Sequence, residues 1–451
     1  MDKKELQKVI DYHRNYVETN GQYGIKANLR HTDLRDVNLK GANLQGTDLK
    51  GANLSNSNLS GINLSDADLS NSDLHGSNLS NANLEGTNLK NANLRGVIMH
   101  KTLLDSADLT GADLSNTDLH KADLTYTMLN NTNLSNTDLS GVQFSSALEG
   151  VNLKSANLSK ACLSNSNLSN ADLSNADLGN VKLQNANLSH VNLSGINLSF
   201  TDLSNINLSC SSLRDANLRD SNLMNADLWN SDLSGADLSG AILTNADLTE
   251  ANLLGTKLKN ARMNSVYLND AEINKLDLSG VNLSNAQMAN LELWNANLHK
   301  ANLSSADLSG TDLYNADLSN ALLCDASLDS AKLNNTNLSN TNLKGASLSG
   351  ADLSNTNLNN ADLSGTNLTN SNLRSTNMEG ATVNENTIIG FTTFADVDLS
   401  NVIGLEKIEH RDHSTIGLDT ITKSNYNIPK VFLKKAGLAQ QLIDKLCSDK
   451  T

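Results

Sequence analysis

A five-residue period runs from Ala27 to Gly404 and constrains the fold of this chain more than any other feature. Each unit holds a small residue, then Asn or Asp, then Leu, usually Ser, and a closing Asn or Gly, as in the opening Ala27-Asn28-Leu29. This period fits neither an α-helix, which repeats every 3.6 residues, nor an isolated strand, which alternates every two. The chain must therefore turn once in every unit.

The residue types within a unit indicate which side chains point inward. Leu and the small residue two positions before it lie on the same side of an extended chain, and the Asn or Asp between them lies on the other. The closing Asn or Gly can adopt the positive φ of a tight turn. Aromatic residues make up only 3% of the chain, as expected where large rings do not fit beside the leucines. The pattern predicts an all-β solenoid with a narrow core of Leu and Ala.

The repeat unit resembles the A(D/N)LXX motif of the pentapeptide-repeat family. The resemblance covers residues 27–404. It implies a right-handed quadrilateral β-helix with four pentapeptides in each coil. Since stacked strands lie about 4.8 Å apart, the repeats would form a rod on the order of 90 Å long.

The segments on either side of the repeats are expected to close the solenoid, because its open ends would expose unpaired sheet edges. Residues 1–26 predict a capping helix and a linker, with Asp2 and Glu5 as a capping-box pair. Residues 405–451 predict a mixed or helical cap or a linker tail, in which Pro429 can open a helix. The apolar residues expected to cover the last coil are Val431, Phe432, Leu433, Leu438, Leu442, Ile443 and Leu446. This cap could also join two copies end to end as a homodimer.

The five-residue register breaks twice. The spacing of Phe144, Leu148 and Leu153 indicates that one residue is deleted near 145–150. The second break is expected between Ile388 and Phe394, where one residue is inserted. Such breaks bend or bulge the wall.

No motif points to catalysis, a cofactor or a metal. The chain has no nucleotide-binding loop, zinc-finger spacing, HExxH motif or nucleophile elbow. Cys162, Cys210 and Cys324 fall on outward positions of different coils. His100 and His120 are one coil apart, so their rings could lie about 5 Å apart, but we expect solvated side chains rather than a metal site. The sequence predicts a protein that is not an enzyme.

One group of residues departs from the repeat in a way that suggests a binding surface. The spacing of four pentapeptides, which makes one coil, places Glu272, Glu292 and Asp312 in one column, and Trp294 and Tyr314 in the adjacent column. Exposed aromatic rings beside carboxylates suit a protein-binding hot spot. The alternative is harmless drift of a repeat surface.

The leading functional hypothesis is a non-enzymatic scaffold, a rigid rod that presents polar ladders to a protein partner. A formal net charge of −15 argues against direct nucleic-acid binding, and no stretch is apolar enough for a membrane span. The charged N-terminus and the unpaired cysteines favour a reducing bacterial cytoplasm, with delivery into a host cell as an open alternative.

Three other functions remain open. Some members of the family mimic DNA and protect type II topoisomerases, but residues 27–404 carry only about −18. That is roughly one charge per 5 Å of rod, against one per about 1.7 Å in duplex DNA. A secreted bacterial effector is the second. Residues 405–451 also resemble a segment that precedes Toll/interleukin-receptor-type modules in some relatives, so the third is a signalling chain that lacks this module.

Overall fold

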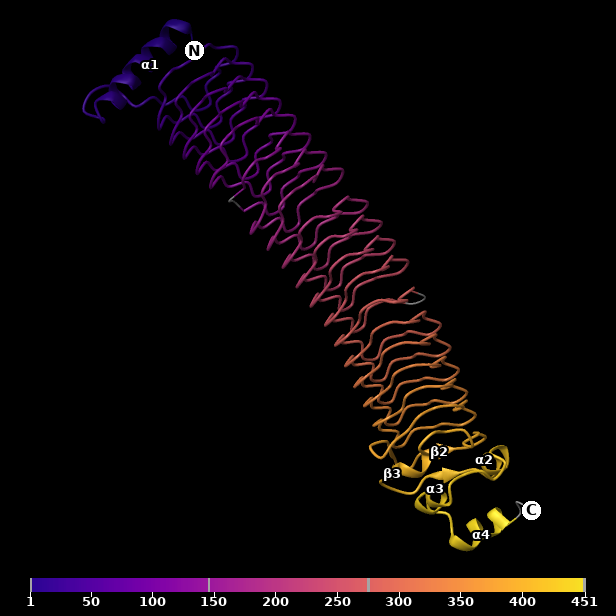
Figure 1. Ribbon diagram of the computed structural model, residues 1–451. Helices are drawn as coiled ribbons and strands as arrows, with labels where there is room; N and C mark the ends of the chain where they lie inside the picture. Colours follow the sequence, from indigo (N-terminus) through magenta and orange to yellow (C-terminus); the bar gives the residue numbers. More distant parts are fainter. Residues whose placement is uncertain (1, 145–146, 274–275, 449–451) are drawn as a thin grey trace. The chain divides into compact units, whose positions relative to one another are not determined.

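The computed structural model describes residues 2–144, 147–273 and 276–448. The chain divides into two compact units, Met1–Leu213 and Arg214–Thr451. Each unit, taken by itself, contains a stack of coils made from pentapeptides (Figure 1). The predicted β-helix solenoid of pentapeptide repeats is therefore confirmed.

Adjacent coils are joined by parallel backbone pairing at the Asn or Asp position. Asn28 pairs with Asp48, and Asp48 pairs with Asp68, so one coil holds four pentapeptides. The hydrogen bonds run in both directions along the stack. The Leu29 N–H donates to the Asp48 carbonyl at 2.8 Å, and the Asn53 N–H donates to the Thr32 carbonyl at 2.9 Å.

Each pentapeptide ends in a tight turn whose geometry explains the choice of the closing residue. The Thr32 N–H donates to the Leu29 carbonyl at 3.2 Å, and His31 between them has a φ of 52°. Positive φ at the third residue of a β-turn favours Gly and Asn. Asn and Gly accordingly fill most of the corners, as at Asn56 with a φ of 56° and Gly41 with a φ of 65°.

The inside and outside positions are those that the sequence predicts. Leu238 and Ala236 are both 0% exposed, and the same pair of positions forms the core throughout the described repeats. Where the small residue is Thr, its hydroxyl is satisfied inside the wall. Thr87 Oγ1, for example, donates to the Leu64 carbonyl at 2.9 Å. Thr can therefore replace Ala without leaving an unpaired hydroxyl in the core, whereas the hydroxyls of Ser77 and Ser231 at the same position are buried without a hydrogen-bond partner among the described residues.

Helix α1 (Lys3–Glu18) lies across the N-terminal coils of the first unit (Figure 1). Asp2 caps its start and forms one of the two hydrogen bonds of the predicted capping box, because the Glu5 N–H donates to Asp2 Oδ1 at 2.8 Å. The buried face consists of Leu6, Ile10 and His13. An amphipathic face of this kind lets a helix pack on the solenoid.

Both register breaks are present, and the structure locates them. Gln143 pairs with Cys162, one position short of a full coil, whereas Ala147 pairs with Asn167 at the regular spacing. The deletion thus lies between Gln143 and Ala147, and residues 145 and 146 lie outside the described residues.

The expected place of the insertion is wrong. Ile388 pairs with Asn367, which is one position more than a full coil, whereas Thr382 still pairs with Asp362 at the regular spacing. The inserted residue therefore lies between Thr382 and Ile388, before the segment in which the sequence placed it. The irregular side-chain pattern after Ile388 had hidden this earlier shift of the backbone pairing.

Parallel pairing continues beyond the last pentapeptide in the second unit. Strand β1 (Ile388–Ile389) pairs with β3 (Glu409–His410), and β2 (Thr393–Phe394) pairs with β4 (Thr415–Ile416). The 3-10 helix η1 (Leu405–Lys407) precedes β3. These strands continue the stack with longer connections than the repeats have.

Three short helices follow: α2 (Leu418–Lys423), α3 (Lys430–Lys435) and α4 (Gln440–Ser448). Helix α3 begins directly after Pro429, as the sequence predicts.

The buried contacts of this segment centre on Phe432. Its ring centroid lies 5.8 Å from that of Phe394 and 5.2 Å from that of His410. Phe432, Leu433 and Ile443 are buried as expected, but Val431 and Leu442 are 43% and 41% exposed, so those two predictions are wrong. The reason is that α3 and α4 each turn only one face inward.

Candidate functional site

The Asn or Asp of each unit points outward, but its side chain is bonded to the wall. Asn63 Oδ1 accepts hydrogen bonds from the N–H of Ser65 at 3.1 Å and from its hydroxyl at 2.9 Å. Asn63 Nδ2 donates to Asn43 Oδ1 in the preceding coil at 3.2 Å. Sequence reasoning assigned these residues to the surface but missed this turn-capping role. A residue other than Asn or Asp at this position therefore changes both the hydrogen bonds within the wall and the chemistry of the outer surface.

Glu272 and Glu292, two of these unusual residues, line the same hollow. The hollow has a volume of about 240 Å³ and is also lined by Asp270 and Asn290. Asp270 sits at the preceding corner with a φ of 57°, which brings a third carboxylate to the site. Sequence reasoning missed Asp270, although its place two residues before Glu272 in the repeat is the signal that could have found it.

Asp312 extends the acidic column but has a counter-charge. Glu292 and Asp312 are paired across adjacent coils, and Asp312 is paired in turn with Lys332. Lys332 Nζ lies 3.3 Å from Asp312 Oδ2, with the two side chains 65% and 29% exposed. An ion pair this exposed contributes little to stability. Among the residues that the structure describes, neither Glu272 nor Glu292 forms an ion pair, so the negative charge of the column is concentrated at these two side chains.

The two aromatic residues of the adjacent column differ in exposure. Tyr314 is 49% exposed, and its backbone N–H donates to Asp312 Oδ1 at 3.1 Å, which fixes the backbone of Tyr314 beside the acidic column. Trp294 is half-buried one coil earlier, where the Asn295 N–H donates to the Tyr314 carbonyl at 2.9 Å. The structure therefore brings the five predicted residues onto neighbouring columns, with Tyr314 as the more exposed ring.

The histidine pair has the predicted spacing. The ring centroids of His100 and His120 are 5.2 Å apart, with the rings tilted by 48°. Among the described residues, no group of three or more His, Cys, Asp or Glu side chains could hold a metal ion. Cys162, Cys210 and Cys324 are half-buried, and none of the three forms a disulfide with another described residue. Within the same described ranges, no helix is both long and apolar enough to cross a bilayer.

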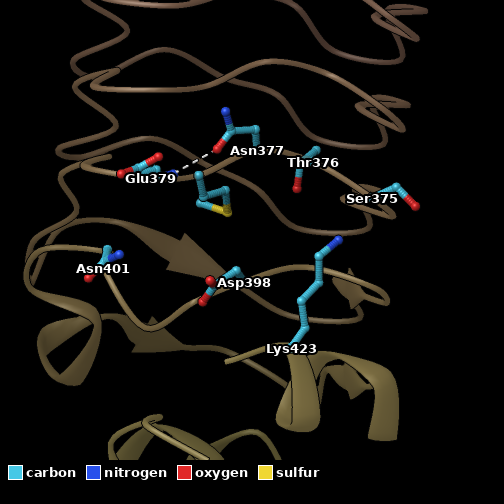
Figure 2. A pocket seen from close by; sticks show the side chains of 8 residues that line it. Ser375, Thr376, Asn377, Glu379, Asp398, Asn401 and Lys423 are labelled. Carbon is cyan, nitrogen blue, oxygen red and sulfur yellow. Dashed lines mark hydrogen bonds between the residues drawn. The ribbon is translucent and has the colours of Figure 1, made fainter. Parts of the chain in front are cut away.

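A second hollow, not anticipated from the sequence, lies in the C-terminal part of the second unit (Figure 2). It has a volume of about 410 Å³. Its lining residues are Ser375, Thr376, Asn377, Met378, Glu379, Asp398, Asn401 and Lys423. No sequence signal could have located it, because the wall there combines regular repeats with the irregular segment after residue 382.

Lys423 holds one side of this second hollow in place. Its Nζ donates to the Asp396 carbonyl at 2.8 Å and to Asp396 Oδ1 at 3.1 Å. Ser375 Oγ donates to the other carboxylate oxygen of Asp396 at 2.9 Å. The hydrogen bonds from Lys423 and Ser375, together with the positive charge of Lys423, lower the pKa of Asp396 below its usual value. Asp396 is therefore an anion that ties helix α2 to the repeat wall.

Comparison with known proteins gives a family and several structural likenesses. The family model for pentapeptide repeats matches twelve segments between residues 25 and 384, from 25–61 to 346–384, and some of these segments overlap. No curated protein matches the chain in sequence.

Among solved structures, the chain is similar to HetL, a pentapeptide-repeat protein involved in heterocyst differentiation regulation from the cyanobacterium Nostoc sp. strain PCC 7120. The match has 29% identity, covers 57% of this chain and 95% of HetL, and has a TM-score of 0.23. A pentapeptide-repeat protein of the Arabidopsis thaliana thylakoid lumen matches at 30% identity over 22% of this chain and 68% of its own, with a TM-score of 0.21.

QnrB1, a plasmid-mediated fluoroquinolone resistance protein, matches at 18% identity over 41% of this chain and 90% of its own, with a TM-score of 0.25. With TM-scores this low, the assignment rests on the repeat model and on the four-pentapeptide coils described above. The chain belongs to the pentapeptide-repeat family.

Proposed function

We propose that this protein is a non-enzymatic interaction scaffold that binds a protein partner through Glu272, Glu292, Asp312, Trp294 and Tyr314. The observation that carries the proposal is Tyr314, whose ring is 49% exposed while its backbone is fixed beside Asp312. A solenoid core made of Leu and small residues gains nothing from an aromatic ring on its outer wall. Aromatic side chains are enriched among the residues that dominate protein interfaces.

The chemistry of this surface favours a partner segment that contains Arg or Lys. A cationic side chain could enter the hollow between Glu272 and Glu292, where Asp270 adds further negative charge. A second cation could stack on the Tyr314 ring, since cations are attracted to aromatic faces. Arg suits both contacts better than Lys, because its planar guanidinium pairs with carboxylates in a bidentate way and also stacks.

In this proposal the terminal segments act as caps. Helix α1 would shield the first coils through its buried face of Leu6, Ile10 and His13. The segment from β3 to α4 would shield the last coils of the second unit, with Phe432 at its centre. Covered ends keep open strand edges from pairing with other chains. The rest of the wall is then free to serve as a binding surface.

The test is a quantitative pull-down from the source cells with Trp294→Ala combined with Tyr314→Ala. Partner recovery should fall several-fold, and the loss of the exposed Tyr314 ring should contribute little to any change in the melting temperature. The control is Trp229→Ala combined with Tyr126→Ala, which removes the same two ring types from other places; these rings are 40% and 67% exposed. Equal loss of the partner with both double variants, or no loss with either, would show that this surface does not bind it.

DNA mimicry is the weaker alternative, because positive charges interrupt the acidic wall. Lys332 lies within the acidic column, and Arg214 and Arg219 lie 3.3 and 3.5 Å from Asp232 and Asp237. A mimic of duplex DNA needs closely spaced and continuous negative charge. We expect no inhibition of gyrase supercoiling by the purified protein at micromolar concentration. Salt-sensitive inhibition would instead favour mimicry.

A further inference from the structure

The second hollow, near the C-terminal end of the repeats, has the features of a preformed ligand site. Its volume of about 410 Å³ falls within the range of roughly 300–1,000 Å³ that is usual for small-molecule pockets. Backbone hydrogen bonds hold its two walls together on both sides. The Ser375 N–H donates to the Ala395 carbonyl at 2.9 Å, and the Val383 N–H donates to the Ile403 carbonyl at 2.9 Å. The hollow is therefore part of the folded wall.

The charged side chains of the hollow leave it negative. Glu379 and Asp398 both line it, and the one cation among its lining residues is Lys423. Lys423 already donates two hydrogen bonds to Asp396. Its positive charge is therefore balanced by Asp396 rather than by Glu379 or Asp398. Figure 2 shows Lys423 reaching from α2 towards the coil that carries Ser375 and Thr376, with Glu379 on the opposite side.

The other lining groups fit a cation that has an apolar stem. Met378 lines the hollow from the core and is only 3% exposed, so its polarisable thioether offers a small apolar contact there. Asn377 and Asn401 add amide groups that can accept hydrogen bonds from a cation. Asn377 Oδ1 already accepts from the Glu379 N–H at 3.2 Å (Figure 2), which keeps the start of the Glu379 side chain in place.

We propose that this hollow binds an alkylguanidinium group, with Glu379 and Asp398 as the anionic partners and Met378 as the apolar contact for its stem. A guanidinium is favoured over an ammonium because its several N–H donors can reach both carboxylates and the neighbouring amide oxygens at once. The group could come from a free metabolite or from an arginine side chain of a protein. This site is separate from the surface around Tyr314 and does not depend on the function proposed for that surface.

The experiment is isothermal titration calorimetry of the full chain with two probes. The first is n-butylguanidinium, and the second is the peptide acetyl-Gly-Arg-Gly-amide. Both should bind saturably and more weakly as salt is raised. Much tighter binding of the peptide would indicate an arginine side chain as the natural ligand, and tighter binding of butylguanidinium would indicate a free metabolite.

The test variant is Glu379→Gln combined with Asp398→Asn, which removes both charges and keeps the shapes. The amide introduced at position 398 would retain the oxygen that accepts from the Ser400 N–H at 2.9 Å and the Ser400 hydroxyl at 2.6 Å. Affinity for both probes should fall by about tenfold or more, since charge-assisted hydrogen bonds are the strong ones. Glu379→Gln alone changes an exposed position and should lower the affinity by less than the double variant does. Because an exposed substitution should not disturb folding, this single variant still tests the proposal if the double variant misfolds.

The matched control is Asp362→Asn, which makes the same change as Asp398→Asn at a residue that does not line the hollow. Asp362 Oδ1 accepts from the Ser364 N–H at 2.9 Å, which is the role that Asp398 has with Ser400. This variant should bind both probes as the unchanged protein does. The proposal is overturned if neither probe binds the unchanged protein, or if a folded Glu379→Gln, Asp398→Asn variant binds them with equal affinity.

Discussion

His13 Nε2 lies 3.1 Å from the backbone oxygen of Gln45, a residue 32 positions later in the sequence. His13 Nδ1 accepts a hydrogen bond from the Ala27 N–H at 3.1 Å. Since Nδ1 must accept, the proton of the neutral ring sits on Nε2 and is donated to Gln45. A single neutral imidazole thus links α1 both to the start of the repeats and to a later turn.

This link predicts that acid loosens α1. Burial lowers the pKa of His13 below its usual 6.5, so the folded state resists a proton that the unfolded state accepts. The stabilisation is present above about pH 6.5 and is lost as the pH falls from there towards the lowered pKa. After correction for the intrinsic pH dependence of amide exchange, hydrogen exchange in residues 3–18 should therefore accelerate as the pH falls below about 6.5.

His13→Gln is the control for this effect, because Gln does not titrate. Its exchange in α1, corrected for the intrinsic pH dependence, should stay constant over the same interval. His410 also has a lowered pKa, about 4, because of burial. Its site is in the second unit, so exchange measured within α1 separates the two histidines. An identical pH dependence in the His13→Gln variant would contradict the account.

The division into inside and outside positions predicts opposite results for neighbouring substitutions. Leu238→Asp places a carboxylate at a position that is 0% exposed and should cost several kcal/mol of unfolding free energy. Asp237→Asn should cost about 1 kcal/mol or less, since Asn keeps the oxygen that accepts from the Ser239 N–H at 3.0 Å. Urea unfolding measures both, and equal midpoints would refute the assignment.

The turn-capping role of the Asn or Asp predicts a graded series at Asn63. Asn63→Ala removes the acceptor for Ser65 and the donor to Asn43, and should cost about 1–2 kcal/mol. Asn63→Asp keeps the acceptor and should cost less. If Asp proves as damaging as Ala in chemical denaturation, the side-chain oxygen does not cap the turn.

Phe200 occupies a turn position that Asn or Gly usually fills, so we expect a substitution there to stabilise the protein. Phe200 has a φ of 59° and is 78% exposed, so its ring gains little burial while its backbone is in a left-handed conformation. Phe200→Asn should raise the unfolding free energy by about 0.5–1 kcal/mol, because Asn adopts this conformation more readily. A thermal melt that moves downward would show that the ring makes a contact worth more than the strain.

The sequence was enough to predict the coil, its core and the column of Glu272, Glu292 and Asp312, because each depends on the strict spacing of one pentapeptide or one coil. It was not enough to predict the hollow between Glu379 and Asp398. That hollow depends on where one inserted residue falls and on how α2 returns Lys423 to the wall, and neither is periodic. The same limit explains why Val431 and Leu442 were wrongly assigned to a buried face.

The charge balance of the acidic column could have been predicted from the sequence. Lys332 stands one coil after Asp312, and the same spacing that defined the column places the two side chains together. Lys332 neutralises only Asp312 within the column, because it lies two coils from Glu292.

Site-specific photocrosslinking tests the proposed binding surface most directly. A photoreactive phenylalanine analogue at position 314 should yield a discrete crosslinked protein in the source cells, and the same analogue at position 126 should not. Tyr126 is the suitable reference, because it is also exposed, at 67%, and lies outside the proposed surface. No adduct at position 314, or the same adducts at both positions, would contradict the proposal that Tyr314 and its acidic neighbours hold the partner.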